Sequence, residues 1–146
     1  MATFPSPVFA DRSEVMNPNF TKHYLPDGRV MHHFRGAHDV DFHDHPFAFV
    51  STIGPAGGYT EEILVEQPGG WAIETHHRAP GQTFTVEAGT KHRLVGLDRG
   101  ECWTVIQASE KVQEPAFYCL DQQGRLQQRF WFEPADAWQP YPRQAA

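Results

Sequence analysis

The chain has 146 residues, with 18 acidic side chains against 12 Lys and Arg, so its net charge is −6 when histidine is neutral. This length predicts one compact domain over residues 1–146, and a hydrophobic content of 40% argues against intrinsic disorder. An acidic chain with no Lys/Arg run lacks the positive surface that nucleic-acid binding requires, so we expect no nucleic-acid partner. All nine histidines lie between His23 and His92.

The first stretch is broken by prolines at positions 5, 7, 18 and 26, which predicts an irregular N-terminal arm. It contains no basic and apolar targeting segment, and no apolar run in the chain is long enough to span a membrane. We therefore expect a cytoplasmic protein with no membrane partner.

From Arg29 onward, short segments rich in β-branched and aromatic residues alternate with Gly- and Pro-rich turns, as in an antiparallel sandwich or small barrel. The predicted strands cover 29–34, 42–53, 58–66, 70–77, 82–88, 91–97 and 101–108. A hairpin is expected from 117–120 and 125–132, and the tail from Pro134 should cross the barrel as an irregular strap. No window shows a helical apolar stripe, so the predicted fold class is all-β.

Two histidines stand two residues apart in the second predicted strand. His43 and His45 would project from one face of a continuous strand, and two converging imidazoles suit zinc, iron, copper or nickel. The same face continues through Phe47 and Phe49, which indicates that it is buried. A surface strand with two solvated histidines is the alternative. His92 opens a later apolar segment, and spacing alone does not place it beside the pair.

The segment from Gly81 to His92 resembles the second motif of the cupin superfamily, G-x5-P-x-G-x2-H, with Glu87 in place of the proline. The segment from Gly36 to Gly57 resembles the first motif, G-x5-H-x-H-x3-4-E-x6-G, with one extra residue before His43. The motif region thus covers residues 36–92.

This resemblance implies a double-stranded β-helix (jelly-roll) barrel, with metal ligands at His43, His45 and His92. The family's glutamate position falls on Phe49 or Val50, and neither side chain can coordinate a metal. The fourth position could therefore stay open. Alternatively, a carboxylate of the next strand, Glu61 or Glu62, could fill it as ligand or catalytic group, although ordinary strand-surface charge would explain both residues.

Other residues are weaker candidates for the site. His77 could line the cavity as a general acid or base, or could be a strand-end histidine that bonds to a turn. An arginine, Arg78 or Arg93, could hold a substrate carboxylate, although solvated strand ends would explain both. The expected pocket wall comprises Phe47, Phe49, Tyr59, Trp71 and Phe84, with core packing as the alternative. Of the pair His32 and His33 at most one can face inward, and neither His23 nor His38 receives a role.

The predicted function is a small cupin metalloenzyme that uses Fe(II) and dioxygen on a small anionic or chelating substrate. Three neutral imidazoles leave the double charge of the ion uncompensated, which favours such a substrate. The alternatives are a Zn, Mn or Ni Lewis-acid isomerase, lyase or cyclase, and a binding module without turnover. Open barrel edges and aromatic, Pro-rich ends also predict a homodimer.

Overall fold

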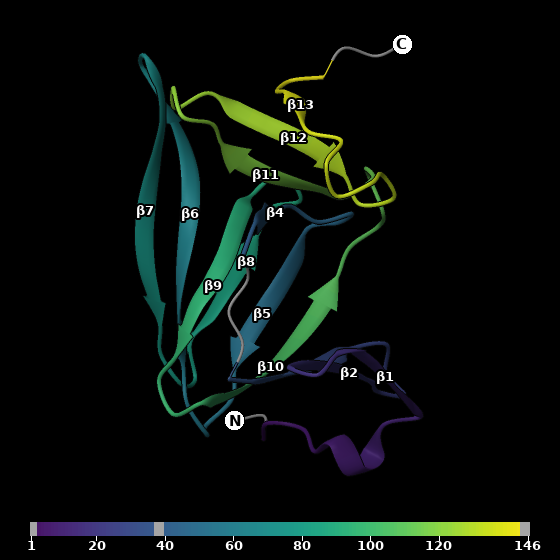
Figure 1. The fold of residues 1–146 in the computed structure, drawn as a ribbon. Coiled ribbons are helices and arrows are strands. Elements are labelled where there is room, and N and C mark those ends of the chain that lie inside the picture. The colour runs from purple at the N-terminus through teal and green to yellow at the C-terminus, as the bar shows by residue number, and fades with distance from the viewer. Residues whose placement is uncertain (1–2, 37–39, 144–146) are drawn as a thin grey trace.

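The computed structural model describes residues 3–36 and 40–143, and His38 therefore lies outside the described residues. The described chain is almost entirely β-structure, as predicted (Figure 1). No helix among the described residues has the length and apolarity needed to cross a membrane. The elements are η1 (Pro7–Phe9), β1 (Arg12–Asn17), β2 (Phe20–Tyr24), β3 (Val30–Arg35), β4 (Phe42–His43), β5 (Phe49–Ile53), β6 (Tyr59–Gln67), β7 (Gly70–Arg78), β8 (Thr83–Val86), β9 (Lys91–Leu97), β10 (Glu101–Ala108), β11 (Ala116–Leu120), β12 (Leu126–Phe130) and β13 (Gln139–Pro140).

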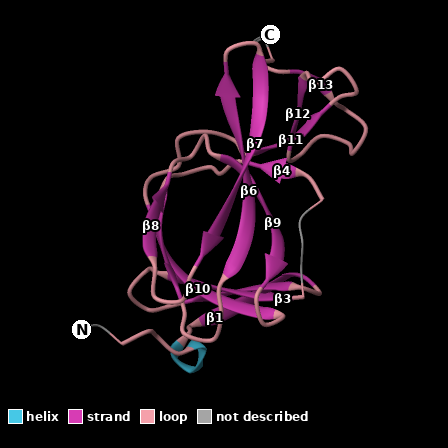
Figure 2. Cartoon of the chain, turned by 90° about the vertical axis from the view of Figure 1, so that its left-hand side faces the viewer, coloured by secondary structure: helices cyan, strands magenta, loops and turns pink. Residues whose placement is uncertain are grey.

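The strands form two antiparallel sheets that curve around a common interior (Figure 2). One sheet has the order β1-β2-β3-β10-β5-β8, and the other has the order β13-β12-β11-β4-β9-β6-β7. Several neighbouring strands are far apart in sequence, as in the pairs β3·β10 and β4·β9. Residues from many segments are thereby brought to one interior, and the predicted all-β barrel is confirmed.

The N-terminal arm is shorter than predicted, because residues 12–24 form the β1–β2 hairpin. Pro18 lies in the turn between the two strands, where its missing N–H removes no ladder hydrogen bond. The side chain of Asn17 closes this turn by accepting a hydrogen bond from the Asn19 amide at 2.8 Å. Proline content alone therefore overstated how irregular this region is.

The predicted strand over 42–53 is broken between β4 and β5, and the two pieces belong to different sheets. Residues 44–48 carry the chain across, with Pro46 at the centre of the break. Backbone hydrogen bonds fix the crossing from both sides, since Asp44 N donates to Ala116 O at 3.1 Å and His45 N donates to Ala88 O at 3.0 Å. The crossing, rather than strand alternation, sets the direction of His45.

Glycine is required at Gly58, where the start of β6 approaches the end of β7. A Cβ atom at this position would lie 2.0 Å from the carbonyl oxygen of Arg78. Any side chain there would push the β6–β7 hairpin apart. This hairpin carries Glu61, so the close approach also holds the strand that positions this carboxylate.

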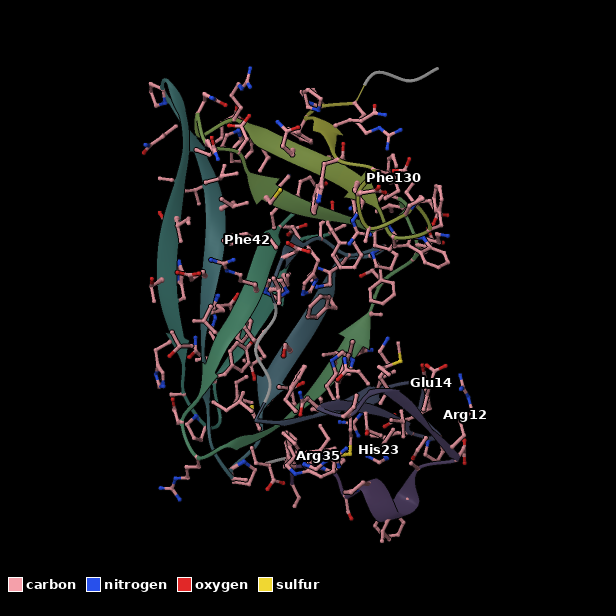
Figure 3. All side chains as sticks on the ribbon, viewed as in Figure 1. Arg12, Glu14, His23, Arg35, Phe42 and Phe130 are labelled. Carbon is pink, nitrogen blue, oxygen red and sulfur yellow. The ribbon has the colours of Figure 1, made fainter. Side chains whose placement is uncertain are left out.

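Apolar packing occupies both faces of the seven-stranded sheet. On the outer face, Phe42 packs with Leu64, Tyr118 and Leu126, and Tyr141 of the C-terminal strap packs against this group. The inner face contributes a second cluster that includes Tyr59 and Leu94. Figure 3 shows Phe42 and Phe130 near the antiparallel pair of β11 and β12, with His23 and Arg35 at the opposite end of the molecule.

Candidate metal centre

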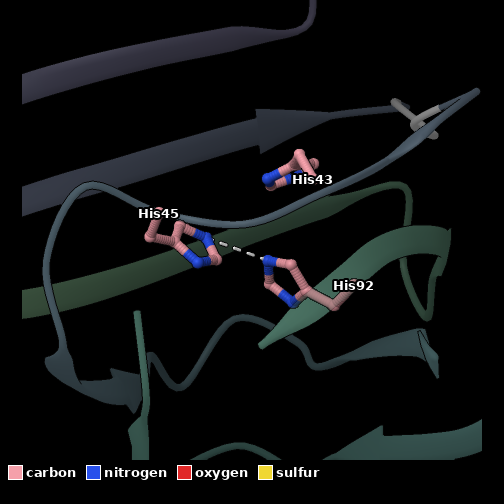
Figure 4. Close-up of side chains that lie close together, drawn as sticks. All are labelled: His43, His45 and His92. Atoms are coloured by element: carbon pink, nitrogen blue, oxygen red, sulfur yellow. Dashed lines mark hydrogen bonds between the residues drawn. The ribbon is translucent and has the colours of Figure 1, made fainter. Parts of the chain in front are cut away.

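The structure brings His43, His45 and His92 together inside the barrel (Figure 4). His43 and His92 are direct cross-strand partners in β4 and β9, and His45 follows β4 in the crossing segment. One nitrogen from each ring lies within 4.8 Å of the others, and the Nε2 atoms of His45 and His92 are 3.1 Å apart. The three side chains are therefore a group that could hold one metal ion.

The spacing of the His45 and His92 rings fits coordination of both by one divalent transition metal. With metal–nitrogen bonds of about 2.1 Å, two ligand nitrogens lie about 3.0 Å apart at a right angle and about 3.4 Å apart at a tetrahedral angle. The separation of 3.1 Å between the Nε2 atoms of His45 and His92 falls in that interval. With an ion bound to both Nε2 atoms, the neutral His45 ring would carry its single proton on Nδ1 instead of between the two rings.

Glu61 holds the ring of His92 from behind. Its Oε1 lies 2.9 Å from His92 Nδ1, and the carboxylate is buried with 2% of the side chain exposed. Because an ionised carboxylate only accepts hydrogen bonds, His92 carries its proton on Nδ1 and keeps the Nε2 lone pair for the site. Burial raises the pKa of Glu61, whereas the hydrogen bonds and charges of His92 and Arg78 lower it. The lowering is larger, so the pKa of Glu61 lies below its ordinary value.

Arg78 completes this support. Its Nε donates to Glu61 Oε2 at 2.9 Å, and its guanidinium lies over the ring of Phe84 at 4.0 Å. The chain of contacts therefore runs from Phe84 through Arg78 and Glu61 to His92. In contrast to the prediction, neither Arg78 nor Phe84 lines the cavity, and Glu61 is placed behind a ligand rather than in the ligand group.

The neighbouring carboxylate Glu62 points to the other face of the sheet, because successive strand residues alternate. It accepts from Arg93 Nε at 2.8 Å, and the Arg93 guanidinium lies 4.2 Å from the centre of the Phe42 ring. Trp71 also packs on the outer face, beside Tyr141. The predicted roles of Glu62 as a ligand and of Arg93 and Trp71 as pocket wall do not match these positions.

His77 lies at the open edge of the sheet, on β7. Its Nε2 is 2.6 Å from Asp98 Oδ2, and 53% of its side chain is exposed. It is not among the residues that line the cavity, in contrast to its predicted role as an acid or base there. The pairing with Asp98 explains a histidine at this strand end.

His45 provides a test of whether the group suits a metal. Burial, followed by the charges of neighbouring histidines and of Lys22, lowers its pKa to about 2, so the imidazole is neutral. Its Nδ1 is buried and has no hydrogen-bond partner among the described residues. Neutral imidazole is the form that binds divalent transition metals, and the donor set therefore fits such an ion.

The histidines open into a cavity of about 300 Å³ between the two sheets. Its wall is mainly apolar and includes the expected Phe47, Phe49 and Tyr59, while hydroxyl groups come from Ser51 and Thr104. The β2–β3 hairpin adds four residues that the sequence did not predict, namely Phe20, Lys22, His32 and Phe34. Alternation along β3 could have suggested His32 and Phe34. Residues 20–24 were predicted to belong to an irregular arm, so the sequence offered no reason to place Phe20 and Lys22 in the cavity wall.

No protein-family model matches the sequence, and no curated protein matches it. Among solved structures, the chain resembles a recombinant oxalate oxidase in complex with glycolate, at 19% identity and a TM-score of 0.51, over 78% of this chain and 62% of that one. It also resembles a 7S globulin from Momordica charantia at 12% identity and a TM-score of 0.54, over 92% and 39% of the two chains. A third match is a single-substitution variant of the oxalate decarboxylase of Bacillus subtilis, at 15% identity and a TM-score of 0.50, over 70% and 28%.

Oxalate oxidase and oxalate decarboxylase are cupin-fold proteins. The chain has the cupin fold. At these identities the likeness extends to the fold alone, and the chain spans less than two thirds of each of these proteins. The resemblance first seen in the two cupin motifs is thereby confirmed for the fold.

The position of the cupin glutamate is occupied by an apolar wall. The Phe49 ring lies 4.9 Å from the His45 ring in an edge contact and lines the cavity, whereas Val50 is 42% exposed. No Asp or Glu is found among the described residues that line the cavity. The glutamate of the first cupin motif, which is missing from the sequence, is therefore not replaced by another carboxylate in the cavity wall. The candidate metal-binding group consists of three imidazoles.

Proposed function

We propose that the protein is a small metal-dependent cupin enzyme, a non-haem Fe(II) dioxygenase acting on a small anionic or chelating organic substrate. The observation that supports this most directly is the group of three imidazoles with no carboxylate in it, at the end of a largely apolar cavity. Iron bound there would supply the redox chemistry that the use of dioxygen requires.

Three neutral ligands would leave the double charge of the ion uncompensated within the group. Glu61 is the carboxylate that supports the site, and its negative charge is already shared with Arg78 at 2.9 Å. An anionic substrate would therefore gain more from this site than a neutral one. The oxalate oxidase neighbour was solved with glycolate, a small organic acid, and we propose the same general ligand class here.

The residues of the wall would position the substrate and exclude water. Phe47 and Phe49 meet in an edge contact with ring centres 6.4 Å apart, and both line the cavity. Apolar rings beside the three histidines lower the local dielectric, which strengthens electrostatic contacts to a bound anion. Glu61 would keep the His92 Nε2 lone pair directed at the ion.

Oxygen uptake tests the proposal. Protein loaded with Fe(II) and given a panel of small 2-hydroxy, 2-oxo and thiol acids should consume oxygen with at least one of them, and Zn(II)-loaded protein should not. His92→Ala, loaded in the same way, is the matched inactive control. Turnover with Zn(II) and no oxygen uptake with Fe(II) would instead indicate a Lewis-acid isomerase, lyase or cyclase, for which Mn or Ni could also serve.

We also propose that the chain forms a homodimer through an open sheet edge. β1 ends the six-stranded sheet, and all six of its residues are exposed, including Val15 at 70% and Met16 at 46%. An unpaired edge with apolar side chains favours pairing with a second copy. Light scattering should give twice the mass of the chain at micromolar concentration, and a monomer mass would contradict the proposal.

A further inference from the structure

The cavity has a second polar end, on the β2–β3 hairpin. Lys22 and His32 are direct cross-strand partners in this hairpin, and both line the cavity. Alternation along β2 explains why the Lys22 side chain points to the cavity, because Phe20 and Lys22 lie on the same face of this strand. The residues between and after them lie on the other face. There, Thr21 bonds to Arg35 and His23 packs on Trp103. The ammonium of Lys22 is therefore presented to the interior by the sheet itself.

Lys22 is the charged residue in this lining. Its Nζ lies 5.9 Å from the centre of the Phe20 ring, and it forms no hydrogen bond or ion pair with any of the described residues. The acid opposite Lys22 in β1 is Glu14, whose carboxylate accepts the Tyr24 hydroxyl at 3.1 Å. Figure 3 shows Glu14 and Arg12 together on β1, the strand at the edge of the six-stranded sheet. Within the described part of the chain, the charge of Lys22 is therefore not neutralised by a carboxylate.

His32 stands beside the ammonium as a neutral donor. Burial, followed by the charge of Lys22, lowers its pKa to about 3, so the ring is uncharged at neutral pH. The edges of Phe20 and Phe34 hold it in place, with ring centres 5.0 and 5.9 Å away. A neutral imidazole carries one N–H that can bond to an oxygen atom.

We infer that Lys22 and His32 form a carboxylate subsite, so that the ligand of this cavity is a small organic acid whose carboxylate lies against the β2–β3 hairpin. The ammonium of a partly buried lysine that no carboxylate of the described chain neutralises gains a charge-assisted hydrogen bond from a carboxylate oxygen, and the imidazole can donate to the same group. The apolar wall between this end and the three histidines would accept the carbon skeleton of the acid.

This inference rests on the proposed function only for the other end of the ligand, which would face the metal. It assigns specificity to Lys22, a residue outside the three-histidine group. A ligand with an acidic group at one end and a reactive or chelating group at the other would use both ends of the cavity.

Binding of acid and amide pairs tests the subsite. Glycolate, 3-methylbutanoate and phenylacetate, each with its neutral amide, are titrated by calorimetry or ligand-detected NMR into the full chain, in metal-free and Zn(II)-loaded form. The wild type should bind at least one acid more tightly than its amide. Lys22→Met should weaken that acid at least tenfold and leave the amide unchanged, and Lys22→Arg should restore most of the preference.

Lys111→Met is the matched control, because Lys111 is an exposed lysine that pairs with Glu114 at 2.6 Å. It should bind every probe as the wild type does, and thermal unfolding checks that each variant is folded. The subsite is overturned if Lys22→Met keeps the acid preference, or if the wild type shows none with any of the three acids. Lys22-dependent acid binding by a protein that takes up no metal would sustain the subsite and overturn the proposed enzyme.

Discussion

Two groups of histidines lie on opposite faces of the barrel wall and differ in how their ring nitrogens are used. On the outer face of the six-stranded sheet, His23 and His33 flank Trp103, with the His33 ring stacked at 3.8 Å. Ser13 bonds to His23 at 2.6 Å, and Glu101 bonds to His33 at 2.9 Å. Each of these two rings therefore has a partner supplied by the protein.

In the inner group the imidazole nitrogens face one another. Nε2 of His45 and Nε2 of His92 are 3.1 Å apart, and Nδ1 of His92 is held by the Glu61 carboxylate. A clustering of histidines in sequence does not separate these two cases, whereas the direction of the nitrogens does. The inner group has the arrangement of a metal site, and the outer group that of a surface network of stacked rings.

The largest effect should come from removing an inner ligand. His92→Ala deletes one of three donors and the contact to Glu61, so we expect the affinity for Zn(II) or Fe(II) to fall at least a hundredfold. Metal competition with a chromophoric chelator measures this change. His33→Ala, in the outer group, should bind metal as the wild type does, and equal losses in both variants would end the distinction between the groups.

A smaller effect is expected from changing Glu61, the carboxylate that holds the ring of His92. Glu61→Gln keeps the shape but removes the charge that holds the Nδ1 proton of His92, so metal affinity should fall roughly 10- to 100-fold. The control is Glu62→Gln on the opposite face, where the partner is Arg93. If Glu62→Gln weakened the metal more than Glu61→Gln, the assigned roles of the two carboxylates would be reversed.

The inner wall should also make the metal-free protein sensitive to acid. His32 stays neutral in the folded state down to a pKa of about 3, whereas an unfolded histidine takes up a proton near pH 6.5. The unfolded state therefore binds more protons between these values, and the free energy of unfolding falls as the pH falls through this window. One such residue contributes up to about 1.4 kcal/mol per pH unit.

Urea unfolding of the metal-free protein at pH 7, 5.5 and 4.5 measures this slope. His32→Phe should lose less stability than the wild type between about pH 6.5 and 4.5, because the proton uptake of one residue is removed. His76→Gln, at an exposed position beside Glu74, should keep the wild-type slope. An unchanged slope in His32→Phe would contradict the buried neutral imidazole.

The smallest effect should come from the outer group. His33→Ala removes the stacking contact with Trp103, which is worth about 1 kcal/mol for an aromatic pair. We expect the melting temperature to fall by a few degrees with no change in the acid preference of the cavity. A loss of that preference would couple the outer group to the interior, and the comparison of the two faces would fail.

Local patterns predicted most of the strands, because short apolar segments between Gly and Pro turns carry a strong signal. The pair His43 and His45 also followed from strand alternation, whereas His92 was added only by the resemblance to the second cupin motif. Local patterns did not predict the break at Pro46, since the alternation from His43 to Phe49 reads like one strand although the chain changes sheets there. The pairing of β4 with β9, which sets His43 opposite His92, depends on contacts far apart in sequence. Neither the role of Glu61 nor the inward position of Lys22 could be derived without that topology.

We propose that three imidazoles hold one ion inside the cupin barrel. X-ray absorption at the metal edge of the loaded protein, together with metal analysis, tests it most directly. We predict one ion per chain with three imidazole ligands at about 2.1 Å and the remaining positions filled by oxygen. A spectrum with fewer than three imidazoles, or a protein that retains no stoichiometric metal, would contradict the account.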